Sequence, residues 1–136
     1  MPLPLLNNKE MDIFIVEDNV LVLSLYVESF KLKGYTVQTA GDGEEAIEKL
    51  TNSEKKPDIV LLDILLPKKN GYEVLEYMKQ QTELQNIPVI FLTNIDGEGE
   101  KKWLTLGAAG YIIKSEQNPL QTIKHVEDII KNYKRE

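Results

Sequence analysis

Residues 57–67 read Pro-Asp-Ile-Val-Leu-Leu-Asp-Ile-Leu-Leu-Pro, a segment in which an apolar run is followed by an acidic residue and a proline. Its first apolar run, Ile59–Leu62, has aliphatic side chains on both faces, which is typical of a central strand in a parallel sheet covered on both sides. The run ends at an acidic residue, Asp63, and Pro67 and Gly71 then mark a loop before the next helical pattern. The stretch therefore predicts a buried parallel strand with a carboxylate at its carboxyl end.

Working outward, short apolar runs alternate with longer amphipathic segments from Asp12 onward. Each predicted strand is followed by a helical pattern, the weakest of which lies within 97–106 because two glycines stand near its start. This alternation predicts an α/β protein, a three-layer, doubly wound (βα)5 fold with five parallel strands. The predicted strands cover residues 13–16, Thr36–Ala40, Ile59–Leu62, 88–92 and 111–113.

The helical spacing of apolar residues predicts which helix faces are buried. In the first helix this face comprises Val20, Leu23, Val27 and Phe30, with Gly34 where a C-terminal cap belongs. The last helix begins near Asn118 and Pro119. Its predicted buried face comprises Leu120, Ile123, Val126, Ile130 and Tyr133.

Length and composition limit the classes of function. The 136 residues are one domain's worth, which we divide into an N-terminal leader, 1–11, and a folded domain, 12–136. The chain has no cysteine and one histidine, His125, which excludes thiolate and multi-histidine metal centres. A formal charge of -6 argues against non-specific binding to nucleic acid or anionic membrane. Without a signal peptide or an apolar run of about 20 residues, we expect a cytoplasmic protein.

Polar residues follow four of the predicted strands at the point where each strand ends. They are Glu17 and Asp18 after the first, Asp63 after the third, Thr93 after the fourth and Lys114 after the fifth. In an open parallel sheet, ligands bind beyond the carboxyl ends of the strands. The sequence therefore predicts three carboxylates, a hydroxyl and an ammonium at one edge.

This donor set indicates Mg²⁺ and phosphoryl chemistry. Crowded carboxylates repel unless a cation lies among them, and oxygen ligands suit a hard ion such as Mg²⁺. Asp63 is the candidate nucleophile toward phosphorus, Asp18 and Glu17 are candidate metal ligands, and Thr93 and Lys114 are candidate ligands of the phosphoryl oxygens. Taken singly, Asp18 and Asp63 would more often be helix caps, and Lys114 a solvated charge. The joint pattern favours a site.

These residues resemble the receiver domain of two-component response regulators, which has the CheY-like (flavodoxin-like) fold. The resemblance covers the chain from Asp12 to the end and implies the strand order 2-1-3-4-5, the order that CheY itself illustrates. It rests on the segments IFIVEDN (13–19), PDIVLLDILLP (57–67) with Gly71, PVIFLT (88–93) and LGAAGYIIK (106–114).

The resemblance implies roles for individual residues. Asp63 corresponds to the phosphoacceptor, and it would hold Mg²⁺ together with Glu17, Asp18 and the backbone carbonyl of Leu65. Thr93 resembles the switch hydroxyl that moves toward the phosphoryl group, and Tyr111 the aromatic residue that turns inward with it. The implied partners are a sensor histidine kinase or a histidine phosphotransfer protein. A downstream protein would bind the face formed by the fourth helix, fifth strand and fifth helix.

Four positions differ from the usual pattern of the family. Ser115 stands where a proline with a cis peptide bond is common, so we expect a trans bond there. Asn94 replaces a small residue and modifies access to the phosphoacceptor. Glu17 replaces the more frequent aspartate and lengthens the reach to the metal. Trp103 stands where a small residue is common, and it is either partly buried or a member of the partner surface.

Three other functions compete with a phosphorylated receiver. The segment GDGEEA (41–46) fits a nucleotide-binding G-x-G-x-x-A motif, but its acidic residues would repel a pyrophosphate. An aspartyl phosphatase would need a second acid two residues after Asp63, where Leu65 stands. A degenerate receiver would bind proteins without being phosphorylated. From these arguments and the length of the chain, we expect a stand-alone receiver that is not an enzyme apart from its own phosphorylation and dephosphorylation.

Overall fold

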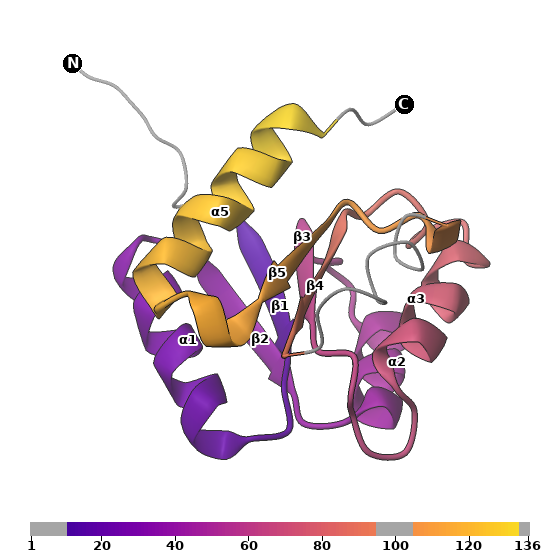
Figure 1. Ribbon diagram of the computed structural model, residues 1–136. Helices are drawn as coiled ribbons and strands as arrows, with labels where there is room; N and C mark the ends of the chain where they lie inside the picture. Colours follow the sequence, from indigo (N-terminus) through magenta and orange to yellow (C-terminus); the bar gives the residue numbers. More distant parts are fainter. Residues whose placement is uncertain (1–10, 95–104, 134–136) are drawn as a thin grey trace.

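The structure is a computed structural model that describes residues 11–94 and 105–133. Five parallel strands form one sheet in the order β2-β1-β3-β4-β5, which confirms the predicted class and strand order (Figure 1). The predicted strand boundaries agree with the structure to within one residue. The strands are β1 Asp12–Val16, β2 Thr36–Ala40, β3 Ile59–Leu62, β4 Val89–Thr93 and β5 Gly110–Ile113.

Helices cover both faces of the sheet. They are α1 Val20–Leu32, α2 Gly43–Asn52, α3 Gly71–Lys79 and α5 Pro119–Asn132. Helices α1 and α5 pack on one face and α2 and α3 on the other (Figure 1). Residues 1–10 of the predicted leader and most of the predicted fourth helix, with Trp103, lie outside the described residues. Within the described ranges, no helix is long and apolar enough to cross a membrane.

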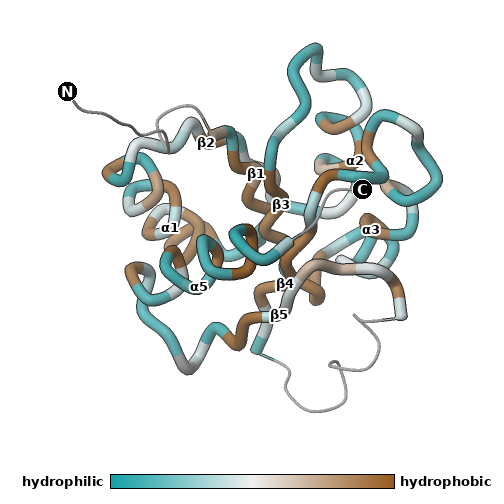
Figure 2. Tube along the Cα trace, turned by 90° about the horizontal axis from the view of Figure 1, so that it is seen from above, coloured by the Kyte–Doolittle hydropathy of each residue, from teal (hydrophilic) through white to brown (hydrophobic). Residues whose placement is uncertain are grey.

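The core divides into two layers because successive strand residues point to opposite faces. Phe14 and Val16 of β1 pack beneath α2 and α3, whereas Ile13 and Ile15 pack beneath α1 and α5. Strands β1, β3 and β4 are fully buried, and in Figure 2 they form the hydrophobic centre of the molecule. The strand sequences are continuously apolar, as expected, because each strand contributes side chains to both layers of the core.

Two residues predicted to be buried are exposed. Val20 of α1 is 73% exposed and Leu120 of α5 is 67% exposed. Both belong to the first turn of a helix, beyond the carboxyl edge of the sheet, where no strand remains to be covered. Deeper in the same helices, Tyr26 and Thr122 are buried instead. Helical spacing gave the direction of each side chain but not its distance from the edge of the core.

Candidate functional site

The carboxyl ends of β1 and β3 bring the acidic residues together. Asp63 continues the ladder beyond β3 through its N–H bond to the carbonyl of Val16, at 3.0 Å. Glu17 does the same beyond β1 through its N–H bond to the carbonyl of Ala40, at 3.1 Å. One carboxylate oxygen from each of Glu17, Asp18 and Asp63 lies within 4.8 Å of the others. The three predicted acids therefore form one cluster.

Lys114 supplies a positive charge to the two buried members of this cluster. Glu17 is only 2% exposed and Asp63 only 5%. The Lys114 Nζ lies 2.7 Å from Glu17 Oε1 and 3.1 Å from Asp63 Oδ2. Burial on its own would lower the pKa of Lys114, but its hydrogen bonds and charge interactions with these carboxylates raise the pKa overall. The lysine therefore stays protonated and offsets the repulsion between the two acids.

The surroundings of Asp63 disfavour its ionised form. Its burial raises its pKa, the charge of Lys114 lowers it, and the charge of Glu17 raises it again. The backbone N–H of Leu65, 3.3 Å from Asp63 Oδ1, also favours the ionised form. The net pKa is about 6, above the ordinary 3.8. The ionised carboxylate is thus under-compensated at neutral pH, and a further cation beside it would be stabilising.

Neither Asp18 nor Asp63 acts as a helix cap. The side chain of Asn19 accepts from the N–H of Val22 at the start of α1, and Asn70 forms a capping box at the start of α3. Asn19 also donates its backbone N–H to Glu17 Oε2, at 3.0 Å. The helix-cap interpretation of these two aspartates is therefore wrong, because Asn19 and Asn70 cap the two helices.

The other predicted site residues occupy the same edge or its surroundings. Thr93 is the fully buried last residue of β4, and Tyr111 on β5 is half-buried against the α2 and α3 side of the core. Asn94 and Leu65 are exposed. The peptide bond between Lys114 and Ser115 is trans, as expected. The switching, access and metal-binding roles given to these residues stay predictions.

A cavity of about 380 Å³ adjoins the acidic cluster on the α1 and α5 side. Its lining includes the polar residues Asn94, Lys114 and Gln117 and the apolar residues Leu25 and Pro119. Its lining is completed by Asn19, Val22, Tyr26 and Ser115. The candidate site therefore has open space beside its lysine.

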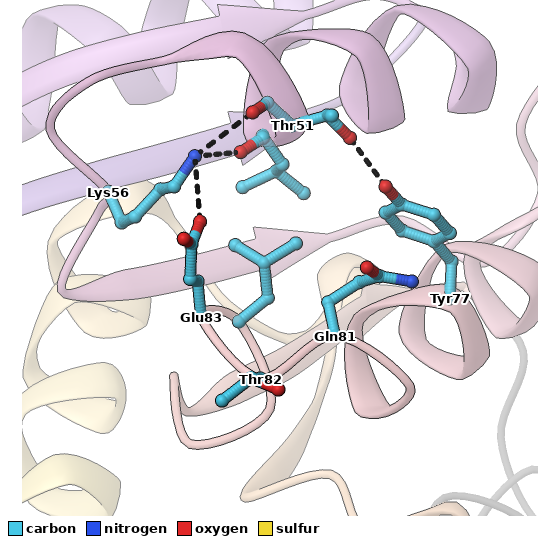
Figure 3. A pocket seen from close by; sticks show the side chains of 8 residues that line it. Thr51, Lys56, Tyr77, Gln81, Thr82 and Glu83 are labelled. Carbon is cyan, nitrogen blue, oxygen red and sulfur yellow. Dashed lines mark hydrogen bonds and ion pairs between the residues drawn. The ribbon is translucent and has the colours of Figure 1, made fainter.

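A second hollow, of about 290 Å³, lies between the carboxyl ends of α2 and α3 (Figure 3). There the Lys56 ammonium donates to the carbonyls of Leu50, Thr51 and Ser53. The Thr51 and Tyr77 hydroxyls lie 2.6 Å apart. These contacts hold the end of α2, because they satisfy carbonyls that have no partner within the helix.

Close backbone contact explains the glycine of the nucleotide-binding motif. A Cβ on Gly43 would meet the backbone carbonyl of Lys69, and the Gly43 N–H bonds to the carbonyl of Pro67, at 3.2 Å. Asp42 caps α2, and Glu45 accepts from the N–H of Gly41, at 2.8 Å. The motif is thus accounted for by the packing of α2 against the loop after β3.

The carboxylate cluster fits a magnesium ion. Mg²⁺ binds oxygen at about 2.1 Å, so opposite ligands in its octahedron lie about 4.2 Å apart, and neighbouring ones lie closer. The spacing of up to 4.8 Å among the oxygens of Glu17, Asp18 and Asp63 lies within a small adjustment of that geometry. The donor set is all oxygen, as a hard cation requires.

Comparison with known proteins decides the family. A sequence profile for the response regulator receiver domain matches residues 13–126. This chain belongs to the response regulator receiver family. Receivers of this family generally bind Mg²⁺ and interact with histidine kinases or phosphotransfer proteins.

Among curated relatives, the chain is 39% identical over 103 residues to the alkaline phosphatase synthesis transcriptional regulatory protein PhoP of Bacillus subtilis, covering 75% of this chain and 41% of PhoP. It is 35% identical to the polar-differentiation response regulator DivK of Brucella anthropi, covering 82% of this chain and 92% of DivK. The receiver therefore spans nearly all of DivK but about two fifths of PhoP.

Solved receivers share the fold. The phosphorylated cyanobacterial phytochrome response regulator RcpA has a TM-score of 0.75 at 35% identity, covering 88% of this chain and 90% of its own. The Mn²⁺-bound form of response regulator Rcp1 has a TM-score of 0.74 at 31% identity, covering 88% and 91%. The chemotaxis regulator CheY4 of Vibrio cholerae has a TM-score of 0.80 at 24% identity, covering 88% and 98%, and supports the fold alone.

Two contacts near the site escaped the sequence analysis. The first is the bond from the Asn19 N–H to Glu17, and the second is a hydrogen bond between Gln117 and His125, whose Nε2 and Nδ1 lie 3.0 Å apart. The first contact uses a backbone N–H, which every residue except proline has, so the residue type gave no signal for it. The pairing of Gln117 with His125 gave none, because it joins a turn to a helix across eight positions.

Proposed function

We propose that this receiver accepts a phosphoryl group on Asp63 from a phosphohistidine, in a Mg²⁺-dependent reaction, and that the change alters its contacts with another protein. The observation that carries the proposal is the placing of Asp63. Its buried carboxylate lies 3.1 Å from the Lys114 ammonium and within 4.8 Å of the oxygens of two other acids. Such an arrangement offers a nucleophile, a metal site and a counter-charge together.

The transfer moves one phosphoryl group between two side chains. A carboxylate oxygen of Asp63 attacks phosphorus, and the new O–P bond forms as the bond from phosphorus to the donor imidazole nitrogen breaks. The electron pair of that bond leaves with the imidazole, which departs neutral because its other nitrogen carries a proton. Lys114 offsets the negative charge carried by the phosphoryl oxygens, and the Thr93 hydroxyl then binds one of them.

Glu17, Asp18, Asp63 and the carbonyl of Leu65 would hold the metal ion. When bound, Mg²⁺ supplies positive charge that neutralises the phosphoryl oxygens and the attacking carboxylate. Two relatives support this part of the proposal, since RcpA was solved phosphorylated and Rcp1 with Mn²⁺. Both are more than 30% identical to this chain.

The donor protein would approach along the carboxyl edge of the sheet. Exposed apolar side chains stand on one side of the site there, Leu21 and Leu25 on α1 and Leu120 on α5, since both helices cover the same face of the sheet. A protein that covers them would place its phosphohistidine above Asp63. A downstream protein would bind the face that includes β5 and α5, and this role stays a prediction because the fourth helix lies outside the described residues.

The wider arrangement of the protein stays a prediction. DivK is matched over 92% of its length, whereas PhoP continues well beyond the match. The absence of enzymatic activity other than phosphorylation and dephosphorylation of Asp63 is part of the same proposal, as is a cytoplasmic location. The competing function is a degenerate receiver that binds proteins without phosphorylation.

Intact-mass analysis after incubation with a small acyl phosphate separates the two functions. We expect the wild-type protein to gain the mass of one phosphoryl group with Mg²⁺ and none with a chelator. Asp63→Asn is expected to gain nothing under either condition. Equal labelling of both proteins would contradict the assignment to Asp63, and the absence of labelling in both would favour the degenerate receiver.

A further inference from the structure

The turn that carries Lys114 is weakly held by its own backbone. After β5 the chain forms a 3-10 helix, Lys114–Glu116, which begins without a side-chain cap. The hydrogen bond that closes it, from the N–H of Gln117 to the carbonyl of Lys114, is long at 3.3 Å. The next firm anchor is the capping box of Asn118 and Gln121 at the start of α5.

A side-chain hydrogen bond fastens this turn to α5. Gln117 Nε2 lies 3.0 Å from Nδ1 of His125 on α5. An amide nitrogen only donates, so the imidazole nitrogen is the acceptor. Gln117 Oε1 is buried without a hydrogen-bond partner in the described part of the chain. The amide is therefore fixed in place by its bond to His125.

Gln117 and Lys114 belong to one local structure. Both line the cavity of about 380 Å³ beside the acidic cluster, and Gln117 ends the turn that Lys114 begins. From that turn the Lys114 ammonium must reach both Glu17, at 2.7 Å, and Asp63, at 3.1 Å. A displacement of about 1 Å in a reacting group is enough to reduce a rate by about 10²-fold.

We propose that His125 is a positioning residue for the phosphoryl-transfer site, and that it acts through Gln117 to hold the turn from which Lys114 reaches Glu17 and Asp63. Only the expected effect of His125 on phosphorylation rests on the proposed function. The structural part of the proposal, the placing of the Lys114 ammonium, is testable without any phosphodonor.

The test measures how fast the Lys114 amine reacts with a small acylating reagent, by peptide mapping, without Mg²⁺ or phosphodonor. The variants are His125→Leu, which removes the acceptor, and His125→Asn, which keeps an acceptor atom on Cγ where Nδ1 stands. Lys56 serves as an internal control, because it is also partly buried. It bonds the carbonyls of Leu50 and Thr51 at the far end of α2 (Figure 3), and also that of Ser53. Lys124→Leu, at an exposed position of α5, controls for a new leucine in the helix.

We expect His125→Leu to increase the labelling rate of Lys114 about fivefold, which corresponds to the loss of one net hydrogen bond. Labelling of Lys56 stays at the wild-type rate, and His125→Asn restores slow labelling of Lys114. Gln117→Leu has the same effect as His125→Leu, and the double variant is no worse than either single one, because both changes remove the same bond. If His125→Leu does not fold, Gln117→Leu with His125→Asn carries the test.

Three results would overturn the proposal: unchanged labelling of Lys114 in His125→Leu, equal increases at Lys114 and Lys56, or an Asn variant that behaves like the Leu variant. A second measurement is the rate of phosphorylation by a small acyl phosphate, which we expect to fall in His125→Leu and recover in His125→Asn. If the wild-type protein takes no phosphate at all, the proposed function fails, while the labelling result still decides the role of His125.

Discussion

Replacing Asp63 by asparagine is expected to stabilise the fold at neutral pH when no divalent cation is present. The pKa of Asp63 is about 6, against an ordinary 3.8, because burial opposes its ionisation and Lys114 only partly compensates. Each pKa unit is worth about 1.4 kcal/mol, so ionised Asp63 costs the folded state up to about 3 kcal/mol. Asparagine carries no charge and avoids that cost.

The effect has a defined pH dependence. Between pH 4 and 6, roughly, the folded protein binds more protons at this residue than the unfolded chain does, so stability falls as pH rises through this window. Below the window both proteins have a neutral side chain at position 63, and their stabilities converge. Above this window the free energy of unfolding of the Asn variant exceeds that of the wild type by the full cost of ionised Asp63.

Urea denaturation in the presence of a chelator, at pH 4.5 and pH 8, measures the difference in the free energy of unfolding. Asp128→Asn serves as the control, because Asp128 is largely exposed on α5 and its pair with Lys124, at 4.0 Å, is a surface contact. We expect its effect to be small at both pH values. An Asp63→Asn variant that is no more stable than wild type at pH 8, or equally more stable at both pH values, would refute the reasoning.

Three further predictions concern the neighbouring residues. Lys114→Met leaves Glu17 and Asp63 buried without a counter-charge. We therefore expect the free energy of unfolding, measured by urea denaturation with a chelator, to fall by about 3–5 kcal/mol. A variant as stable as the wild type would contradict the stabilising role of this ion pair. Gly71→Ala places a Cβ against the backbone carbonyl of Asp63, so we expect the free energy of unfolding to fall by about 1–3 kcal/mol in the same assay. An unchanged free energy of unfolding would show that the backbone relaxes around this contact without cost. Mg²⁺ is expected to raise the melting temperature of the wild type much more than that of Asp18→Asn, because binding to the folded state adds RT ln(1 + [L]/Kd) to the free energy of unfolding. Equal increases would show that Asp18 is not a metal ligand.

The strands and the acidic edge were predictable because each depends on local sequence. Runs such as Ile59–Leu62 fill both core layers, and a parallel sheet brings the residue after each strand to one edge. Glu17, Asp63 and Lys114 meet there as expected, although their catalytic roles are not tested by their positions. The alternation of strands and helices predicted which side chains lie together at the carboxyl edge of the sheet.

Features that depend on depth or on distant partners were not predictable in the same way. Val20 and Leu120 have the right helical angle but lie beyond the sheet, so they are exposed. The pKa of Asp63 depends on how deeply its carboxyl is buried and on how far Lys114 reaches into the cluster, and no spacing along the chain gives either. The contact between Gln117 and His125 depends on the shape of one turn.

The central claim is that Asp63 is the residue that carries the phosphoryl group. After incubation with a small acyl phosphate and Mg²⁺, reduction of the acyl phosphate with borohydride leaves a stable mark that peptide fragmentation can locate. We expect this mark on Asp63 alone, and its loss when a chelator replaces Mg²⁺. A mark on Glu17, Asp18 or Asp58, or on Asp63 regardless of Mg²⁺, would contradict it.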